Sequence, residues 1–170
     1  MKKIVEYFRN PLHLSAALFV ACLGVLAFAY ISQYVFHYDP CILCLYQRKP
    51  YYAVLALSLV GMTFYKKRPA VTQYTLVLSA LSFFVGAAIA AYHTGVEQAW
   101  WEGTKSCGDA GLPSGATLDQ LREYLSTKRV TRCDVPSWKL FGLSMTNYNL
   151  AQSIIFGIGT LWLSLRNKNP

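Results

Sequence analysis

The chain has 170 residues, a length that fits one domain, and it is 54% hydrophobic but only 14% charged. Soluble domains carry about 25% charged residues, so this composition argues against a soluble protein. The formal net charge of +8 could suit nucleic-acid binding. However, acidic and basic residues balance in the long segment 93–147, which predicts no surface for a polyanion.

Four apolar segments, taken in chain order, predict membrane-spanning helices over residues 12–35, 46–65, 71–92 and 148–165. A helix needs about 20 apolar residues to cross the hydrocarbon core of a bilayer. Arg48 and Lys49 interrupt the second segment near its start, and we interpret them as its polar rim. The first apolar run is longer than that of a cleaved signal peptide and continues past Ala29, which favours a retained span.

Basic residues gather at one end of the predicted spans: Lys2, Lys3 and Arg9 before the first, Lys66, Lys67 and Arg68 between the second and third, and Arg166 and Lys168 after the fourth. By the positive-inside rule this end is cytoplasmic, together with both termini. The loops at about 36–45 and 93–147 then lie on the outer side of the membrane, which is the periplasmic side in a bacterial inner membrane such as the family resemblance below implies. Pro40 predicts that the second helix begins close to Cys41, and Pro69 predicts a helix break before the third span.

These patterns predict an all-α membrane protein, a single domain over residues 1–170, built as an up-down bundle of four transmembrane helices. Small residues at Gly86, Gly157 and Gly159 predict close helix approach. In the long loop, the leucines of residues 118–125 recur at helical spacing. This short helix is expected to lie flat on the membrane, or alternatively to pack against the rest of the loop.

The chain has five cysteines. Cys22 falls within the first span and is interpreted as a small buried apolar residue. The other four, Cys41, Cys44, Cys107 and Cys133, all fall on the predicted outer side, where disulfides persist. Their pairing is open, since four cysteines permit three arrangements. Cys-x-x-Cys at a helix start favours a reactive thiolate.

Other residues near this pair leave two readings each. Arg48 lies one turn beyond Cys44, where it stabilises a Cys44 thiolate or binds a ligand, or else reaches into the headgroup layer. Cys107 with Cys133 is either a structural staple or part of a thiol relay. His93 is either a hydrogen-bond donor to a quinone carbonyl or an interfacial residue without a role. The soft ligands Cys41, Cys44 and His93 permit metal binding, but no regular four-ligand set appears, so no metal site is predicted.

Several motifs together are similar to one family: Pro40-Cys-Ile-Leu-Cys-Leu-Tyr-Gln-Arg48, Tyr92-His93-Thr94, Cys107 with Cys133, Trp138, and Phe141-Gly-Leu-Ser-Met145. The chain resembles the DsbB family of bacterial inner-membrane oxidases over essentially its whole length. The alternatives are a vitamin K epoxide reductase-like enzyme and a structural or metal-handling membrane protein. The first places its quinone-proximal Cys-x-x-Cys near the last span rather than the second.

The resemblance implies a thiol:quinone oxidoreductase that serves a periplasmic, DsbA-like thioredoxin-fold oxidase and uses ubiquinone or menaquinone. It implies that the partner's thiolate attacks Cys107, which releases Cys133. Cys133 then attacks Cys41, and Cys44 passes electrons to the quinone. Arg48 would polarise the quinone, while His93 and Met145 would line its pocket.

Overall fold

The computed structural model describes residues 6–104, 107, 117–119 and 132–166. Its elements are α2 (Pro11–Tyr34), α3 (Ile42–Phe64), α4 (Pro69–Glu97), β1 (Lys139–Leu140), β2 (Leu143–Ser144) and α6 (Met145–Arg166). The chain is predominantly helical, as predicted. Helices α2 and α4 are long and apolar enough to cross a membrane. That α3 and α6 also span the membrane stays a prediction.

A short β-hairpin was not predicted, and in this respect the all-α expectation was incomplete. Strands β1 and β2 pair antiparallel, with Lys139 opposite Ser144 and Leu140 opposite Leu143. The two turn residues, Phe141 and Gly142, both have positive φ, at 50° and 80°. Two-residue hairpin turns of this backbone type match the twist of the flanking strands. The hairpin leads directly into α6.

The helix starts follow local capping rules. The side chain of Asn10 accepts the backbone N–H of Leu12 and caps α2, which has Pro11 in its first turn. Cys41 caps α3, which confirms the predicted start close to that residue, and α4 begins at Pro69, which confirms the predicted break before the third helix. Helix α4 runs to Glu97 rather than ending at residue 92. The predicted third span therefore gains a turn, and this turn carries side chains of the site.

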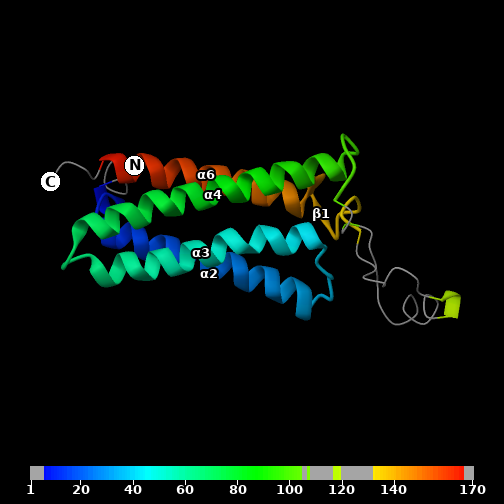
Figure 1. Ribbon diagram of the computed structural model, residues 1–170, viewed down its shortest axis with the longest axis horizontal. Coiled ribbons are helices and arrows are strands. Elements are labelled where there is room, and N and C mark those ends of the chain that lie inside the picture. The colour runs from blue at the N-terminus through cyan, green and yellow to red at the C-terminus, as the bar shows by residue number, and fades with distance from the viewer. Residues whose placement is uncertain (1–5, 105–106, 108–116, 120–131, 167–170) are drawn as a thin grey trace.

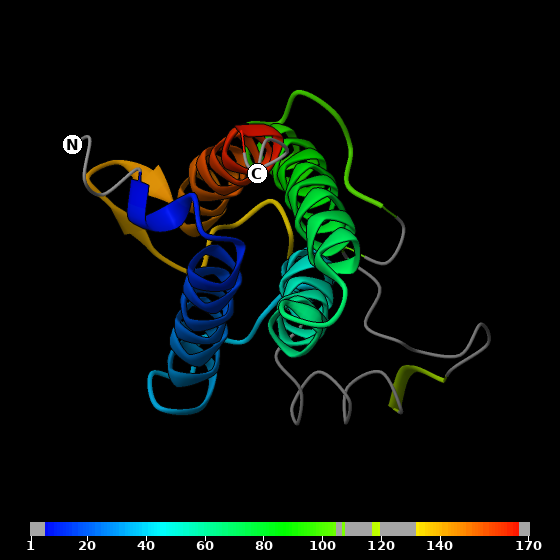
Figure 2. The ribbon, with the colours of Figure 1, turned by 90° about the vertical axis from the view of Figure 1, so that its left-hand side faces the viewer.

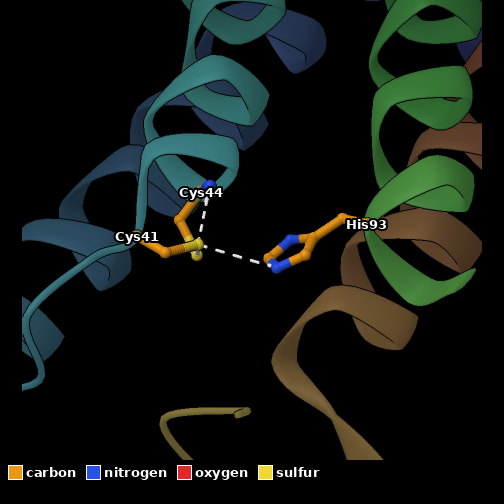
Figure 3. Close-up of side chains that lie close together, drawn as sticks. All are labelled: Cys41, Cys44 and His93. Atoms are coloured by element: carbon orange, nitrogen blue, oxygen red, sulfur yellow. Dashed lines mark hydrogen bonds between the residues drawn. The ribbon is translucent and has the colours of Figure 1, made fainter. Parts of the chain in front are cut away.

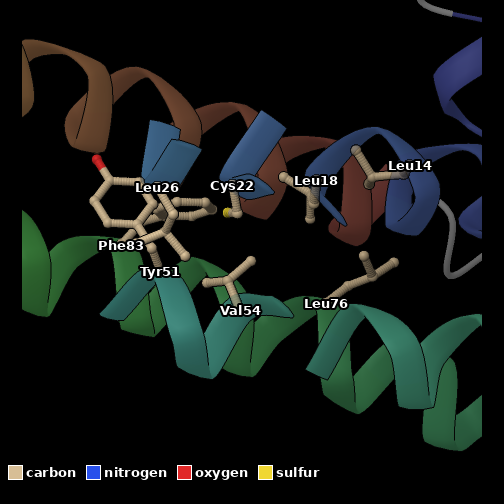
Figure 4. Packing of buried hydrophobic residues seen from close by; sticks show 8 residues of the cluster. All are labelled: Leu14, Leu18, Cys22, Leu26, Tyr51, Val54, Leu76 and Phe83. Atoms are coloured by element: carbon tan, nitrogen blue, oxygen red, sulfur yellow. The ribbon is translucent and has the colours of Figure 1, made fainter. Parts of the chain in front are cut away.

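Helices α3 and α6 both pack against α4, and α2 packs against α3 (Figures 1 and 2). The turn between α3 and α4 and the C-terminal end of α6 lie at one end of the bundle, and the start of α3 lies at the other (Figure 1). Between the helices lies an apolar core, the middle cluster, of Leu14, Leu18, Cys22, Leu26, Tyr51, Val54, Leu76 and Phe83 (Figure 4).

Among the small residues predicted to allow close helix approach, Gly86 and Gly157 lie against a neighbouring helix. A Cβ placed on Gly86 would lie 3.4 Å from the ring of Pro50 in α3, and one on Gly157 would lie 3.0 Å from the ring of Phe84. Gly159 has nothing within 4 Å, so its predicted contact is wrong. The predicted helix over residues 118–125 lies outside the described residues except for Leu118 and Asp119.

Candidate functional site

The first cysteine of the Cys-x-x-Cys pair forms the N-cap of α3. Cys41 Sγ accepts the backbone N–H of Cys44 at 3.3 Å, and the two sulfur atoms lie 2.8 Å apart as free thiols. The hydrogen bond from the Cys44 thiol lowers the pKa of Cys41 to about 5, against the opposing effect of burial; His93 also lowers it. A thiolate is therefore favoured on Cys41, the residue at the positive end of the α3 dipole.

His93 from α4 faces this pair (Figure 3). Its Nε2 atom lies 3.6 Å from Cys41 Sγ and 3.1 Å from the carbonyl oxygen of Cys133. The side chain is only 2% exposed. His93 is therefore buried between the Cys-x-x-Cys pair and Cys133 of the long loop.

The second pair of cysteines forms a disulfide between Cys107 and Cys133. Cys133 is 1% exposed and packs in one cluster with Cys41, while Cys44 and Cys107 pack against that cluster as partly buried neighbours. We call these four residues, with Leu43 and Val96, the cysteine cluster. The long loop thus brings its disulfide onto the start of α3 rather than holding it apart as a remote staple.

A chain of amides and hydroxyls holds the other side of the His93 ring. Gln47 Nε2 lies 2.7 Å from His93 Nδ1, and Asn149 of α6 donates its Nδ2 to Gln47 Oε1. Tyr51 donates its hydroxyl to Asn149 Oδ1 at 2.5 Å. Buried polar groups of this kind are normally hydrogen-bonded, and the chain fixes the orientation of the imidazole. It also joins α3, α4 and α6 at the site.

A buried carboxylate completes this network. The side chain of Glu97, one helical turn after His93, is 4% exposed, and its Oε1 lies 3.8 Å from His93 Nε2. Thr146 donates to Oε1 at 2.7 Å, and Ser144 donates to Oε2. Ser144 also accepts the N–H of Asn147, which places it at the start of α6. Two hydroxyl donors thus hold the Glu97 side chain against the start of α6.

Arg48 points away from the cysteines toward α2. Its Nη1 donates to Gln33 Oε1 at 2.8 Å and its Nη2 to the carbonyl of Ala29 at 3.4 Å. The guanidinium also lies 5.0 Å from the ring centre of Tyr30. The residue is 8% exposed, which argues against a side chain that reaches into the headgroup layer. The sequence predicts a thiolate on Cys44, whereas the hydrogen bonds in the structure favour a thiolate on Cys41.

A cavity of about 110 Å³ nevertheless brings three expected residues together, because Cys44, Arg48 and Met145 all line it. Its other lining residues are Val25, Leu26, Phe28, Ala29, Gln47, Tyr51, Trp138, Thr146, Tyr148, Asn149 and Gln152. His93 is not among them. The buried Nε2 atom of Gln152 has no hydrogen-bond partner. An unpaired buried donor costs about 1–3 kcal/mol, so a ligand acceptor in this cavity would relieve it.

The metal-handling alternative also has a geometric basis. The ligand atoms of Cys41, Cys44 and His93 lie within 4.8 Å of one another. In the part of the chain that the structure describes, no fourth His, Cys, Asp or Glu joins this group. Three close donors do not complete the four-ligand set of a structural zinc site.

Comparison with known proteins now decides between these alternatives. The family model for disulfide bond formation protein DsbB matches residues 11–163. The chain belongs to the DsbB family. A disulfide bond formation protein B of Xanthomonas campestris is 26% identical over 153 residues, 89% of each chain. That of Dechloromonas aromatica is 28% identical over 141 residues, which cover 79% of this chain and 81% of the relative. An uncharacterized protein of Rickettsia prowazekii is 30% identical over 83% of this chain and 80% of its own.

Membership of the DsbB family, together with the apolar helices, places the chain in a membrane and assigns it to disulfide bond formation as an oxidoreductase. It favours this assignment over the vitamin K epoxide reductase-like and metal-handling alternatives. Sequence reasoning missed Gln47, Glu97, Asn149 and Gln152. The only available signal was helical spacing: Glu97 follows His93 by four residues, and Gln47 follows Cys44 by three.

Proposed function

We propose that this chain is a thiol:quinone oxidoreductase of the bacterial inner membrane, which oxidises a periplasmic DsbA-like dithiol oxidase. One observation carries the proposal. Within the cysteine cluster, His93 Nε2 contacts both Cys41 Sγ and the carbonyl oxygen of Cys133. Cys44 instead borders the cavity, together with Arg48 and Met145. The two members of the Cys-x-x-Cys pair therefore have different neighbours, as a relay from an outer disulfide to an inner acceptor requires.

The proposed relay consists of two disulfide exchanges. The partner's thiolate attacks Cys107 Sγ, which forms a mixed disulfide and releases Cys133 as a thiolate. Cys133 then attacks Cys41 of an oxidised Cys41–Cys44 pair, and Cys44 leaves as the thiolate.

The partner has a place to approach the outer disulfide. A cleft of about 790 Å³ runs beside Cys107 and is lined by Trp100, Trp101 and Arg132, among others. Trp100 is 69% exposed. Exposed aromatic rings and an arginine are typical of protein-binding surfaces. We propose that the thioredoxin-fold partner presents its reactive cysteine in this cleft.

The residues of the cavity fit a quinone head group. Cys44 offers an electron-donating sulfur, while Arg48 and the unpaired amide of Gln152 offer donors for carbonyl oxygens. Phe28 and Leu26 provide an apolar wall for the ring. When bound, ubiquinone or menaquinone supplies the two-electron acceptor of the reaction. Because His93 does not line the cavity, we propose that it acts at Cys41 and not as a quinone contact.

We further propose four spans, with both termini cytoplasmic and the cysteine cluster periplasmic. In support, the basic turn between α3 and α4 and the start of α3 lie at opposite ends of the bundle (Figure 1). Accessibility of Cys41 and Cys44 to a membrane-impermeant thiol reagent added from the periplasmic side tests this orientation. Labelling from the cytoplasmic side alone would contradict it.

The proposed activity is tested with the purified full chain, a reduced DsbA-like dithiol and a soluble quinone, by following quinone reduction. Loss of activity in both Cys44→Ser and Cys107→Ser supports the relay. Loss in Cys44→Ser alone would make the outer disulfide a staple, and full activity in Cys44→Ser would refute the mechanism. Cys22→Ser serves as the matched control, because Cys22 lies in the middle cluster away from both pairs.

A further inference from the structure

We propose that Glu97 is the charge partner of His93, and that the pair holds the proton that leaves Cys41 when this residue becomes a thiolate. This inference rests on the proposed function for its place in the reaction. It assigns a role to a buried carboxylate that neither the motifs nor the quinone cavity account for. Glu97 acts through His93 and is therefore a positioning residue, not one that touches the reacting sulfur.

The position of Glu97 is electrostatically unusual. It is the last residue of α4, where the dipole of its own helix disfavours a negative charge. The start of α6 compensates, because Ser144 and Thr146 both donate hydroxyl protons to the carboxylate. Both carboxylate oxygens therefore have a hydroxyl donor, in a site where the Glu97 side chain is only 4% exposed.

His93 has acceptors for the hydrogens of both ring nitrogens. Around Nε2 lie Cys41 Sγ, the Cys133 carbonyl and Glu97 Oε1, at 3.6, 3.1 and 3.8 Å. Near Nδ1 lies Thr146 Oγ1, at 3.2 Å. A hydroxyl that already donates to Glu97 can accept a hydrogen from Nδ1. The surroundings therefore suit an imidazolium ion, whose positive charge Glu97 offsets.

The amide chain behind His93 suits both protonation states. In the observed arrangement, Gln47 Nε2 donates to His93 Nδ1, so the single N–H of a neutral imidazole lies on Nε2. Turning over the amides of Gln47 and Asn149 reverses the chain, so that Nδ1–H donates to Gln47 and the hydroxyl of Tyr51 becomes an acceptor. Nε2 then carries a lone pair, 3.6 Å from Cys41 Sγ and 3.1 Å from the carbonyl oxygen of Cys133. The reversal needs no movement of the backbone.

The proton step follows from this geometry. The S–H bond of Cys41 breaks, its two electrons remain on sulfur, and the proton forms an N–H bond at His93 Nε2. The products are a Cys41 thiolate and an imidazolium whose charge Glu97 balances. The titratable groups that face His93 are the thiols of Cys41 and Cys44 from α3 and the carboxylate of Glu97 from α4; the Cys107–Cys133 disulfide does not titrate.

The direct test follows the imidazole of His93 by NMR titration in the full chain, with wild type, Glu97→Gln and Glu102→Gln. The chain has three histidines, and His93→Gln assigns the signal. Removing a negative charge beside an imidazolium makes protonation harder, so Glu97→Gln is expected to move the titration midpoint down by about one pH unit. Glu102 is exposed, and its variant serves as the matched control. An unchanged midpoint in Glu97→Gln would overturn the inference.

A second measurement separates charge from packing. Glu97→Gln is expected to slow quinone-dependent dithiol oxidation about 10- to 100-fold and to shift its pH profile. Glu97→Asp keeps the charge and should retain more of the rate. Equal losses in both variants with an unshifted profile would make the residue purely structural. If the wild type shows no quinone-dependent oxidation, the proposed function fails, whereas the NMR titration still tests the Glu97–His93 pair.

Discussion

Two buried cysteines, in two regions of the same bundle, differ in everything except their burial. Cys22 is 0% exposed and lies in the middle cluster among leucines, Val54 and Phe83. Cys41 is 4% exposed and lies at the outer end, with a second thiol and an imidazole against its sulfur. Burial alone makes a thiol inert, whereas burial with hydrogen-bond donors and a helix N-terminus makes it reactive. The neighbours decide which of the two cysteines does chemistry.

The largest expected effect comes from exchanging the two cysteines for alanine. Cys41→Ala is expected to reduce quinone-dependent oxidation of the partner to background, because the relay loses the sulfur that Cys133 attacks. Cys22→Ala should keep the full rate and cost about 1 kcal/mol of stability, the cost of a small cavity. Steady-state rates and thermal unfolding measure the two effects. Activity in Cys41→Ala would place the reactive thiol elsewhere.

The pH dependence of the thiolate sharpens the same comparison. The pKa of Cys41 lies at about 5, well below the usual value near 8.5, because the Cys44 thiol donates to its sulfur. A lowered pKa means that the thiolate is present above pH 5 and disappears as the pH falls through that value. Ultraviolet absorbance of the reduced chain, with Cys41→Ala subtracted, should show this step. A midpoint near 8.5 would contradict the proposed hydrogen bonding.

Glycine substitutions compare the two regions in terms of packing. A Cβ on Gly95, near the C-terminal end of α4, would clash with the ring of Trp101, which stacks on Tyr92 and donates its N–H to the carbonyl of Tyr92. Gly95→Ala is therefore expected to destabilise the fold by about 1–3 kcal/mol. Gly24, in α2, has nothing within 4 Å of such an atom, and Gly24→Ala should be neutral or slightly stabilising. Thermal unfolding of both variants in detergent measures the difference.

The smallest expected effect concerns the cavity beside Cys44. Gln152→Leu removes a buried donor that has no hydrogen-bond partner among the described residues. If that donor binds a quinone carbonyl, its loss costs about 1 kcal/mol, which raises the KM for quinone about fivefold. The KM for the dithiol partner should not change and is the internal control. An unchanged KM for both the quinone and the dithiol partner would show that Gln152 does not contact the quinone.

Much of the fold follows from local sequence rules. Pro69 opens α4 and Cys41 caps α3 because proline and N-cap preferences act over a few residues. Gly86 allows close approach to Pro50, as its small size predicts, whereas Gly159 does not pack, because a glycine faces a partner only if the helix is rotated that way. The hairpin before α6 escaped prediction, since its strands have only two residues each.

By itself the sequence determined the helical character of the chain, two helices able to cross a membrane, the cysteine pair at a helix start and the family. These properties depend on composition, on spacing within one helix and on motifs that are contiguous in the chain. Only the tertiary structure decided that Cys133 meets Cys41 through His93, that Arg48 turns toward α2, and that Glu97 lies against the start of α6. Such contacts join residues as far as 102 positions apart, as between Gln47 and Asn149, and no local pattern encodes the rotation of packed helices that brings them together.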